Sequence, residues 1–259
     1  MQQSAGSQGH DSRLRARASN GVACAAFLAI ALAILALAAG PILTDDLWWH
    51  VAMGKVYATE GPWPSGGDPL LHTAHEDSPV QHEWLFGNQN FAVERAGGFG
   101  GLRVLHTLLV TAILGLAVLH FRRAAPAPAA AWAAAAAFAV LGWWRLFQLR
   151  PDLTTMLSTL LAAQLLLLRP DPPSPRRVAA YLALFLVWAN LHSLFAIGLA
   201  LHFALLLGLV LEAALASAVA AGSLAPARVW AALRRILPGE RARRAGAVGL
   251  AFVLTVLVT

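Results

Sequence analysis

Apolar stretches about as long as a bilayer is thick recur along this chain and restrict its fold more than any other feature. The first covers residues 21–43 and contains 23 residues without a formal charge. About 20 such residues allow an α-helix to cross the hydrocarbon core of a bilayer. The whole chain is 58% hydrophobic and only 12% charged, which excludes an ordinary soluble domain. The sequence therefore predicts an all-α fold, a polytopic transmembrane helical bundle.

The apolar segments that follow define five further crossings. Residues 178–211 contain no formal charge over 34 positions, which is too long for a single crossing. Asn190 and His192 supply a polar break in the middle of this stretch. We therefore expect transmembrane helices two to six within residues 101–221, over the approximate ranges 104–121, 124–144, 153–168, 178–190 and 194–219.

The positions of the arginines predict which side of the membrane each loop occupies. Cytoplasmic loops are enriched in Lys and Arg. If the basic tail, 1–20, is cytoplasmic and six crossings follow, the basic loop at 222–245 is also cytoplasmic, and 14 of the 19 basic residues lie inside. This topology accounts for the net charge of +6 without a nucleic-acid partner. We expect an integral membrane protein with a cytoplasmic N-terminus.

The same topology leaves one large external loop, residues 44–100. This loop holds eight of the chain's 13 acidic residues. Prolines and glycines in its middle, GPWPSGGDP at 61–69, predict turns. The flanking segments, about 46–59 and 83–96, are expected to form short helices at the membrane interface, a level that suits the tryptophans Trp48, Trp49 and Trp84.

Two adjacent acids, Asp45 and Asp46, follow the first apolar segment and carry two interpretations. In one they cap the next helix, because acids stabilise the positive end of a helix. In the other they supply a general base or a ligand, because ionisable groups at a membrane commonly mark a functional site. His50 lies four residues after Asp46, on the same helix face, where it could orient the carboxylate or share its proton.

Arg145 and Arg150, in WWRLFQLRPDL, lie on the expected outer side of the membrane. Guanidinium groups match the geometry of phosphate, which favours a site for a phosphorylated ligand. Pro151 predicts the start of a helix, whose first N–H groups would also favour an anion. Arginines that only extend toward lipid headgroups are the plainer alternative.

The histidines of the chain show no recognised zinc spacing. His82 and Glu83, in HEWL, and His192, in WANLH, are therefore expected to form hydrogen bonds rather than to bind zinc. A divalent cation held by Asp45, Asp46 or Glu83 together with a substrate phosphate stays open as a cofactor.

Five sequence blocks occur in the order typical of one group of bacterial integral-membrane proteins. They are DDLWWH at 45–50, a glycine followed by P…DP, HEWL at 82–85, RP at 150–151 and WANLH at 188–192. Through these blocks, over about residues 44–203, the chain resembles the GT-C superfamily of glycosyltransferases. The resemblance implies a longer chain with more spans, so the last apolar run, 246–259, is expected to be the truncated start of a seventh helix.

The resemblance also implies a reaction and assigns roles. It implies transfer of a sugar from a polyprenyl- or dolichyl-phosphate-linked donor to an acceptor at the outer face of the bacterial cytoplasmic (inner) membrane. Asp46, directly before LWWH, inherits the role of base on the acceptor, with Asp45 as the neighbouring candidate. Thr44 stands where members often carry a further acid, so a strict D-x-D pattern is absent. The candidate substrate-binding residues are His50, His82, Glu83, Trp84, Arg145, Arg150, Asn190 and His192.

Two other function classes stay open on the sequence. One is a ligase or polymerase of lipid-linked glycans, and the other is a non-catalytic binding or scaffold protein in which the acids only cap a helix. A transporter is less well supported, because the ionisable residues gather at one face rather than near the bilayer midplane. The expected partners are the lipid-linked sugar donor and membrane lipids.

Overall fold

The computed structural model describes residues 3–44, 46–63, 83–221 and 240–258. Within these ranges the chain forms eight α-helices and no strand, which confirms the all-α class. Four helices are long and apolar enough to cross a membrane: α1 (Gln3–Ala38), α3 (Trp84–Ala124), α4 (Pro128–Leu146) and α7 (Phe195–Ala221). The chain is therefore a polytopic helical membrane protein.

Four other helices are shorter or more polar. They are α2 (Leu47–Glu60), α5 (Pro151–Ala162), α6 (Pro175–Leu191) and α9 (Glu240–Val258). At the predicted fourth and fifth crossings, α5 and α6 have 12 and 17 residues, and neither is among the four helices that are long and apolar enough to cross. The structure shows why α5 is short: its backbone passes into a π-helix at Ala163–Leu167.

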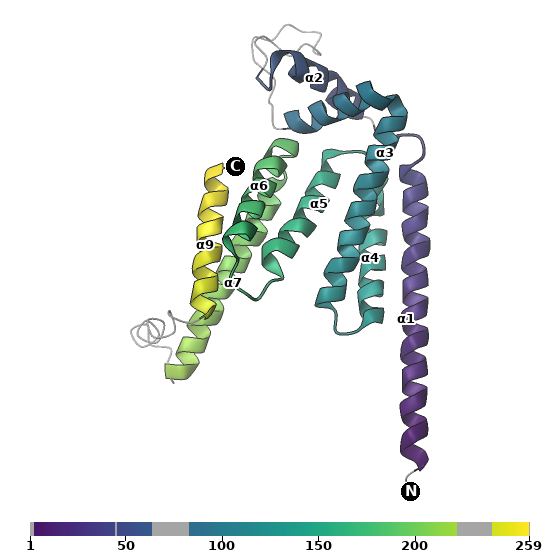
Figure 1. Cartoon of the computed structure of the whole chain (residues 1–259), viewed down its shortest axis with the longest axis vertical. Coiled ribbons are helices and arrows are strands. Elements are labelled where there is room, and N and C mark those ends of the chain that lie inside the picture. The colour runs from purple at the N-terminus through teal and green to yellow at the C-terminus, as the bar shows by residue number, and fades with distance from the viewer. Residues whose placement is uncertain (1–2, 45, 64–82, 222–239, 259) are drawn as a thin grey trace. The chain divides into compact units, whose positions relative to one another are not determined.

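The chain divides into two compact units, 1–160 and 161–259. In the first unit α1 packs along α4 and contacts α3 (Figure 1). Small side chains on α4 are buried at intervals of four residues, at Ala131, Ala135 and Ala139. This spacing places them on one helix face, and the small side chains let the helix backbones come close. Phe27 of α1 packs beside Trp132 of α4, with ring centroids 5.5 Å apart.

A short helix and the first part of a long one run crosswise to α1 and to the second part of α3 (Figure 1). The short helix, α2, covers the segment predicted at 46–59. The segment predicted at 83–96 is joined to the second predicted crossing in the single helix α3. The two parts of α3 meet at a kink where Gly98 has φ 57° and ψ −152°. Only glycine adopts this region without strain, so the glycine-rich AGGFGG stretch lets the chain turn from the surface into the apolar span.

Two glycines bring α2 and α3 into backbone contact. A Cβ atom at Gly54 would lie 2.1 Å from the carbonyl oxygen of Gly87, and one at Gly87 would lie 2.9 Å from the carbonyl oxygen of His50. Neither position has room for a side chain. This close crossing fixes α2, and with it the segment that begins at Asp46, against the first part of α3.

In the second unit α6 and α7 pack with α9. Its core contains the aromatic side chains of Tyr181, Phe185 and Trp188, which lie on one face of α6. Gly198 of α7 faces them, since a Cβ atom there would lie 2.4 Å from the Trp188 ring.

We expect the change Gly54→Ala to destabilise the unit that contains α2. The added methyl group meets backbone rather than a flexible side chain, so α2 must shift, at a cost of about 1–3 kcal/mol. Thermal unfolding of the full chain in detergent, followed by tryptophan fluorescence, should show a lower midpoint. Gly115→Ala in α3 is the matched control, because a Cβ atom there has no neighbour within 4 Å. Equal midpoints for the two variants would show that the crossing is not tight.

Candidate active site

The carboxylate of Asp46 pairs with the guanidinium of Arg150. Arg150 Nη2 donates a hydrogen bond to Asp46 Oδ2, although the two residues are 104 positions apart in the sequence. Asp46 directly precedes α2, but its side chain makes no capping hydrogen bond. The capping interpretation therefore does not describe the Asp46 carboxylate, which instead joins the start of α2 to the start of α5.

The second oxygen of this carboxylate has a different environment. Asp46 Oδ1 is shielded from solvent and has no hydrogen-bond partner among the residues that the structure describes. The hydroxyl of Thr44, two positions earlier, is in the same condition. An unsatisfied buried polar atom costs about 1–3 kcal/mol. Asp46 Oδ1, on the carboxylate that binds the Arg150 guanidinium, and the Thr44 hydroxyl can thus each form a hydrogen bond that the described part of the protein does not supply.

Arg150 owes its position to the connection between α4 and α5. Pro151 begins α5, as the sequence predicts, so Arg150 directly precedes the first turn of that helix. The connection is held by His106 of α3, whose Nε2 lies 3.0 Å from the carbonyl oxygen of Leu146. Leu146 and Leu149 are fully buried. Arg150 therefore lies in a short, well-packed segment between α4 and α5.

Arg145 lies in the last turn of α4 and faces Asp152 in the first turn of α5. Arg145 Nη1 and Asp152 Oδ2 are 3.5 Å apart, and the arginine side chain is 49% exposed. Beside it, the exposed rings of Trp143 and Trp144 form an aromatic group with the half-buried ring of Phe147, with centroids 5.0 to 5.8 Å apart. Both predicted phosphate-binding arginines thus flank one helix–helix junction, and each contacts an aspartate.

His50 is buried between α2 and the start of α3. Its Nε2 lies 3.6 Å from Glu83 Oε2, and the side chains of both residues are largely buried. The ring also meets Phe86 edge to face at 5.0 Å. The expected relation of His50 to Asp46 rested on helix spacing; in the structure the imidazole faces Glu83. Trp84, the next predicted residue, begins α3.

Of the other predicted residues, two are not described by the structure and two belong to the second unit. Asp45 and His82 fall outside the described residues. Asn190 and His192 lie at the end of α6 in the second unit, where Asn190 Nδ2 donates to the carbonyl oxygen of Leu186 at 2.7 Å. His192 is buried and ends the helix, with its backbone N–H bonded to the carbonyl oxygen of Trp188 at 2.9 Å.

The sequence leaves open a divalent cation held by Asp45, Asp46 or Glu83. A protein site for such an ion needs several converging oxygen or nitrogen ligands. In the described ranges, no three His, Cys, Asp or Glu side chains are grouped in this way.

Sequence reasoning missed two partners in this site. Asp152 was not singled out, although it directly follows the RP block and a helix start favours an acid. His106 lies inside an apolar segment of the sequence, where a lone polar side chain is itself a signal that it meets a backbone group.

Comparison with known proteins returned no relatives. No protein-family model matches the chain, and neither a curated protein nor a solved structure matches it.

The Asp46–Arg150 contact should be measurable as a coupling free energy. Both side chains are about one-third exposed, so we expect the double-mutant cycle of Asp46→Asn and Arg150→Gln to give about 1 kcal/mol in the free energy of unfolding. The cycle of Asp46→Asn with Arg145→Gln is the control, because Arg145 faces Asp152 instead. Equal coupling in the two cycles would mean that Asp46 senses only the general positive charge of the junction.

Proposed function

We propose that this chain is a membrane glycosyltransferase that moves a sugar from a polyprenyl-phosphate-linked donor to an acceptor hydroxyl. The observation that supports the proposal best is the contact between Asp46 and Arg150. It puts a carboxylate, one oxygen of which has no partner among the described residues, beside the Arg150 guanidinium at the start of α5. Sugar transfer from a lipid phosphate needs this combination, a base for the acceptor and a positive group for the departing phosphate.

The proposed reaction uses these groups in one displacement. The acceptor hydroxyl donates its proton to the carboxylate of Asp46, whose side chain is 32% exposed. The acceptor oxygen bonds to the anomeric carbon of the sugar, and the bond from that carbon to the phosphate oxygen breaks. The electron pair leaves with the polyprenyl phosphate, whose negative charge Arg150 stabilises. Arginine carries five N–H donors, so one guanidinium can contact the carboxylate and the phosphate together.

Arg145, in the last turn of α4, would contact the same phosphate from the α4 side of the junction between α4 and α5. Its guanidinium is half-exposed and faces Asp152 at 3.5 Å, longer than an ideal hydrogen bond. A phosphate that arrives at the start of α5 would also lie at the positive end of that helix. The tail of the donor would lie in the bilayer, beside the exposed apolar surface of the membrane-spanning helices.

The first test is the change Asp46→Asn. The amide keeps the shape of the side chain but cannot take the proton, so transfer should fall by roughly a hundredfold or more. The measurement is release of polyprenyl phosphate from radiolabelled polyprenyl-phosphate mannose and glucose, in membranes that contain the full chain. Donor release can be followed without knowledge of the natural acceptor.

Asp171→Asn is the matched control for that experiment. Asp171 pairs with Arg177 at the start of α6, so the same chemical change removes a different Asp–Arg pair. We expect this variant to keep its transfer rate. Unaltered donor release with Asp46→Asn would exclude Asp46 as the base and favour a non-catalytic role.

We further propose that the end of the first unit that bears α2 faces the outside of a bacterial cytoplasmic (inner) membrane. The arginine distribution supports this orientation. Single cysteines at the exposed positions Thr59 in α2 and Ala127 before α4, in a Cys24→Ser background, would report it. In intact cells a membrane-impermeant maleimide should label Thr59→Cys and leave Ala127→Cys unlabelled. The reverse pattern would invert the proposed topology.

A further inference from the structure

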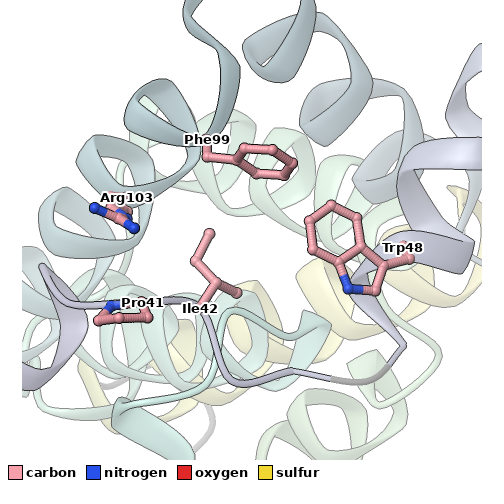
Figure 2. A pocket seen from close by; sticks show the side chains of 5 residues that line it. All are labelled: Pro41, Ile42, Trp48, Phe99 and Arg103. Carbon is pink, nitrogen blue, oxygen red and sulfur yellow. The ribbon is translucent and has the colours of Figure 1, made fainter.

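A pocket of about 250 Å³ lies between the end of α1, the first turn of α2 and the kinked helix α3. Pro41, Ile42, Trp48, Phe99 and Arg103 line it, and Figure 2 shows their side chains around one space. Neither Pro41, Ile42, Phe99 nor Arg103 takes part in the reaction proposed above. The pocket is therefore a separate feature of the first unit.

The walls of the pocket are apolar apart from one charge. Trp48 and Phe99 meet edge to face with centroids 5.2 Å apart, yet they stay 47% and 54% exposed. Each of these aromatic rings packs against the other and is also partly exposed. Together they form a surface that an apolar or amphipathic molecule can cover. The position of Phe99 follows from the kink, because this residue directly follows Gly98.

Arg103 brings a positive charge to this apolar setting. Among the residues that the structure describes, no carboxylate pairs with its guanidinium. Arg145 and Arg150, at the neighbouring junction, both face aspartates. A guanidinium is well suited to a phosphate group, which it can bind through two parallel hydrogen bonds. The pocket thus offers one cationic contact within otherwise apolar walls.

The pocket also lies at the level where the apolar spans begin. Pro41 and Ile42 follow the end of α1 at Ala38. Arg103 is the last formally charged residue of α3 before the uncharged stretch 104–121. Tryptophan and arginine at such a boundary commonly contact lipid headgroups.

We propose that this pocket binds the headgroup of an anionic phospholipid from the surrounding bilayer, with its phosphate on Arg103. The volume is below the about 300–1,000 Å³ typical of sites that enclose a whole small ligand. It therefore suits a headgroup and the start of an acyl chain, while the rest of the lipid stays in the bilayer. The proposal does not depend on sugar transfer, since a chain without that activity would bind the lipid equally well.

The test is titration of the delipidated full chain, in detergent, with dioleoyl phosphatidylglycerol, followed by native mass spectrometry. The wild-type chain should bind one molecule of this lipid more tightly than dioleoyl phosphatidylcholine. Arg103→Gln should weaken phosphatidylglycerol binding about tenfold, which is the loss of one charge-assisted contact. Phe99→Ala should also weaken it, because that change removes part of the apolar wall.

Arg95→Gln is the matched control. Arg95 is an exposed arginine on the same helix and does not line the pocket, so this variant should bind phosphatidylglycerol as the wild type does. Equal losses for the two arginine variants would show that surface charge alone attracts the lipid. Equal affinity for phosphatidylcholine, or displacement of the lipid by millimolar inorganic phosphate, would overturn the proposal as well. Unchanged thermal midpoints of Arg103→Gln and Phe99→Ala would establish that neither result reflects unfolding.

Discussion

Exclusion of charge from the bilayer is the constraint on which the rest of this structure depends. A charged side chain costs several kcal/mol near the centre of a membrane, so such groups collect where the apolar helices end. In the first unit, Asp46, Arg145 and Arg150 all lie at helix ends, and Arg103 stands just before an uncharged stretch. Residues far apart in the sequence therefore meet at one level, and a polar site arises there from the ends of the helices.

The sequence predicted the elements of this arrangement well. An uncharged run of 23 residues predicts a membrane helix. The helix α1 covers this run from its start to Ala38. The helix predicted at about 46–59 differs from α2 by one residue at each end. Pro151 marked a helix start because its fixed φ suits the first turn, and α5 begins there.

Contacts between elements were much harder to predict. The pairing of Asp46 with Arg150 joins residues 104 positions apart. Helix spacing is informative only over three or four residues, so the sequence pointed to His50 as the partner of Asp46 instead. The union of two predicted segments in α3 depends on Gly98, whose φ of 57° lets one helix turn without ending. The pocket beside Phe99 exists because of that turn, so no local pattern indicated it. Asp45 and His82 lie outside the described residues.

The pairing of Asp46 with Arg150 also limits how the site can be arranged for the proposed reaction. The guanidinium holds the carboxylate through Asp46 Oδ2 and leaves Oδ1 without a partner among the described residues. A phosphate bound to the same guanidinium would fix Arg150 and, through it, the orientation of the Asp46 carboxylate. Under the proposed function, donor binding and placement of the base would then be one event. An acceptor hydroxyl, and water with it, would meet a correctly placed base only when a donor is in place, which protects the site from wasteful hydrolysis.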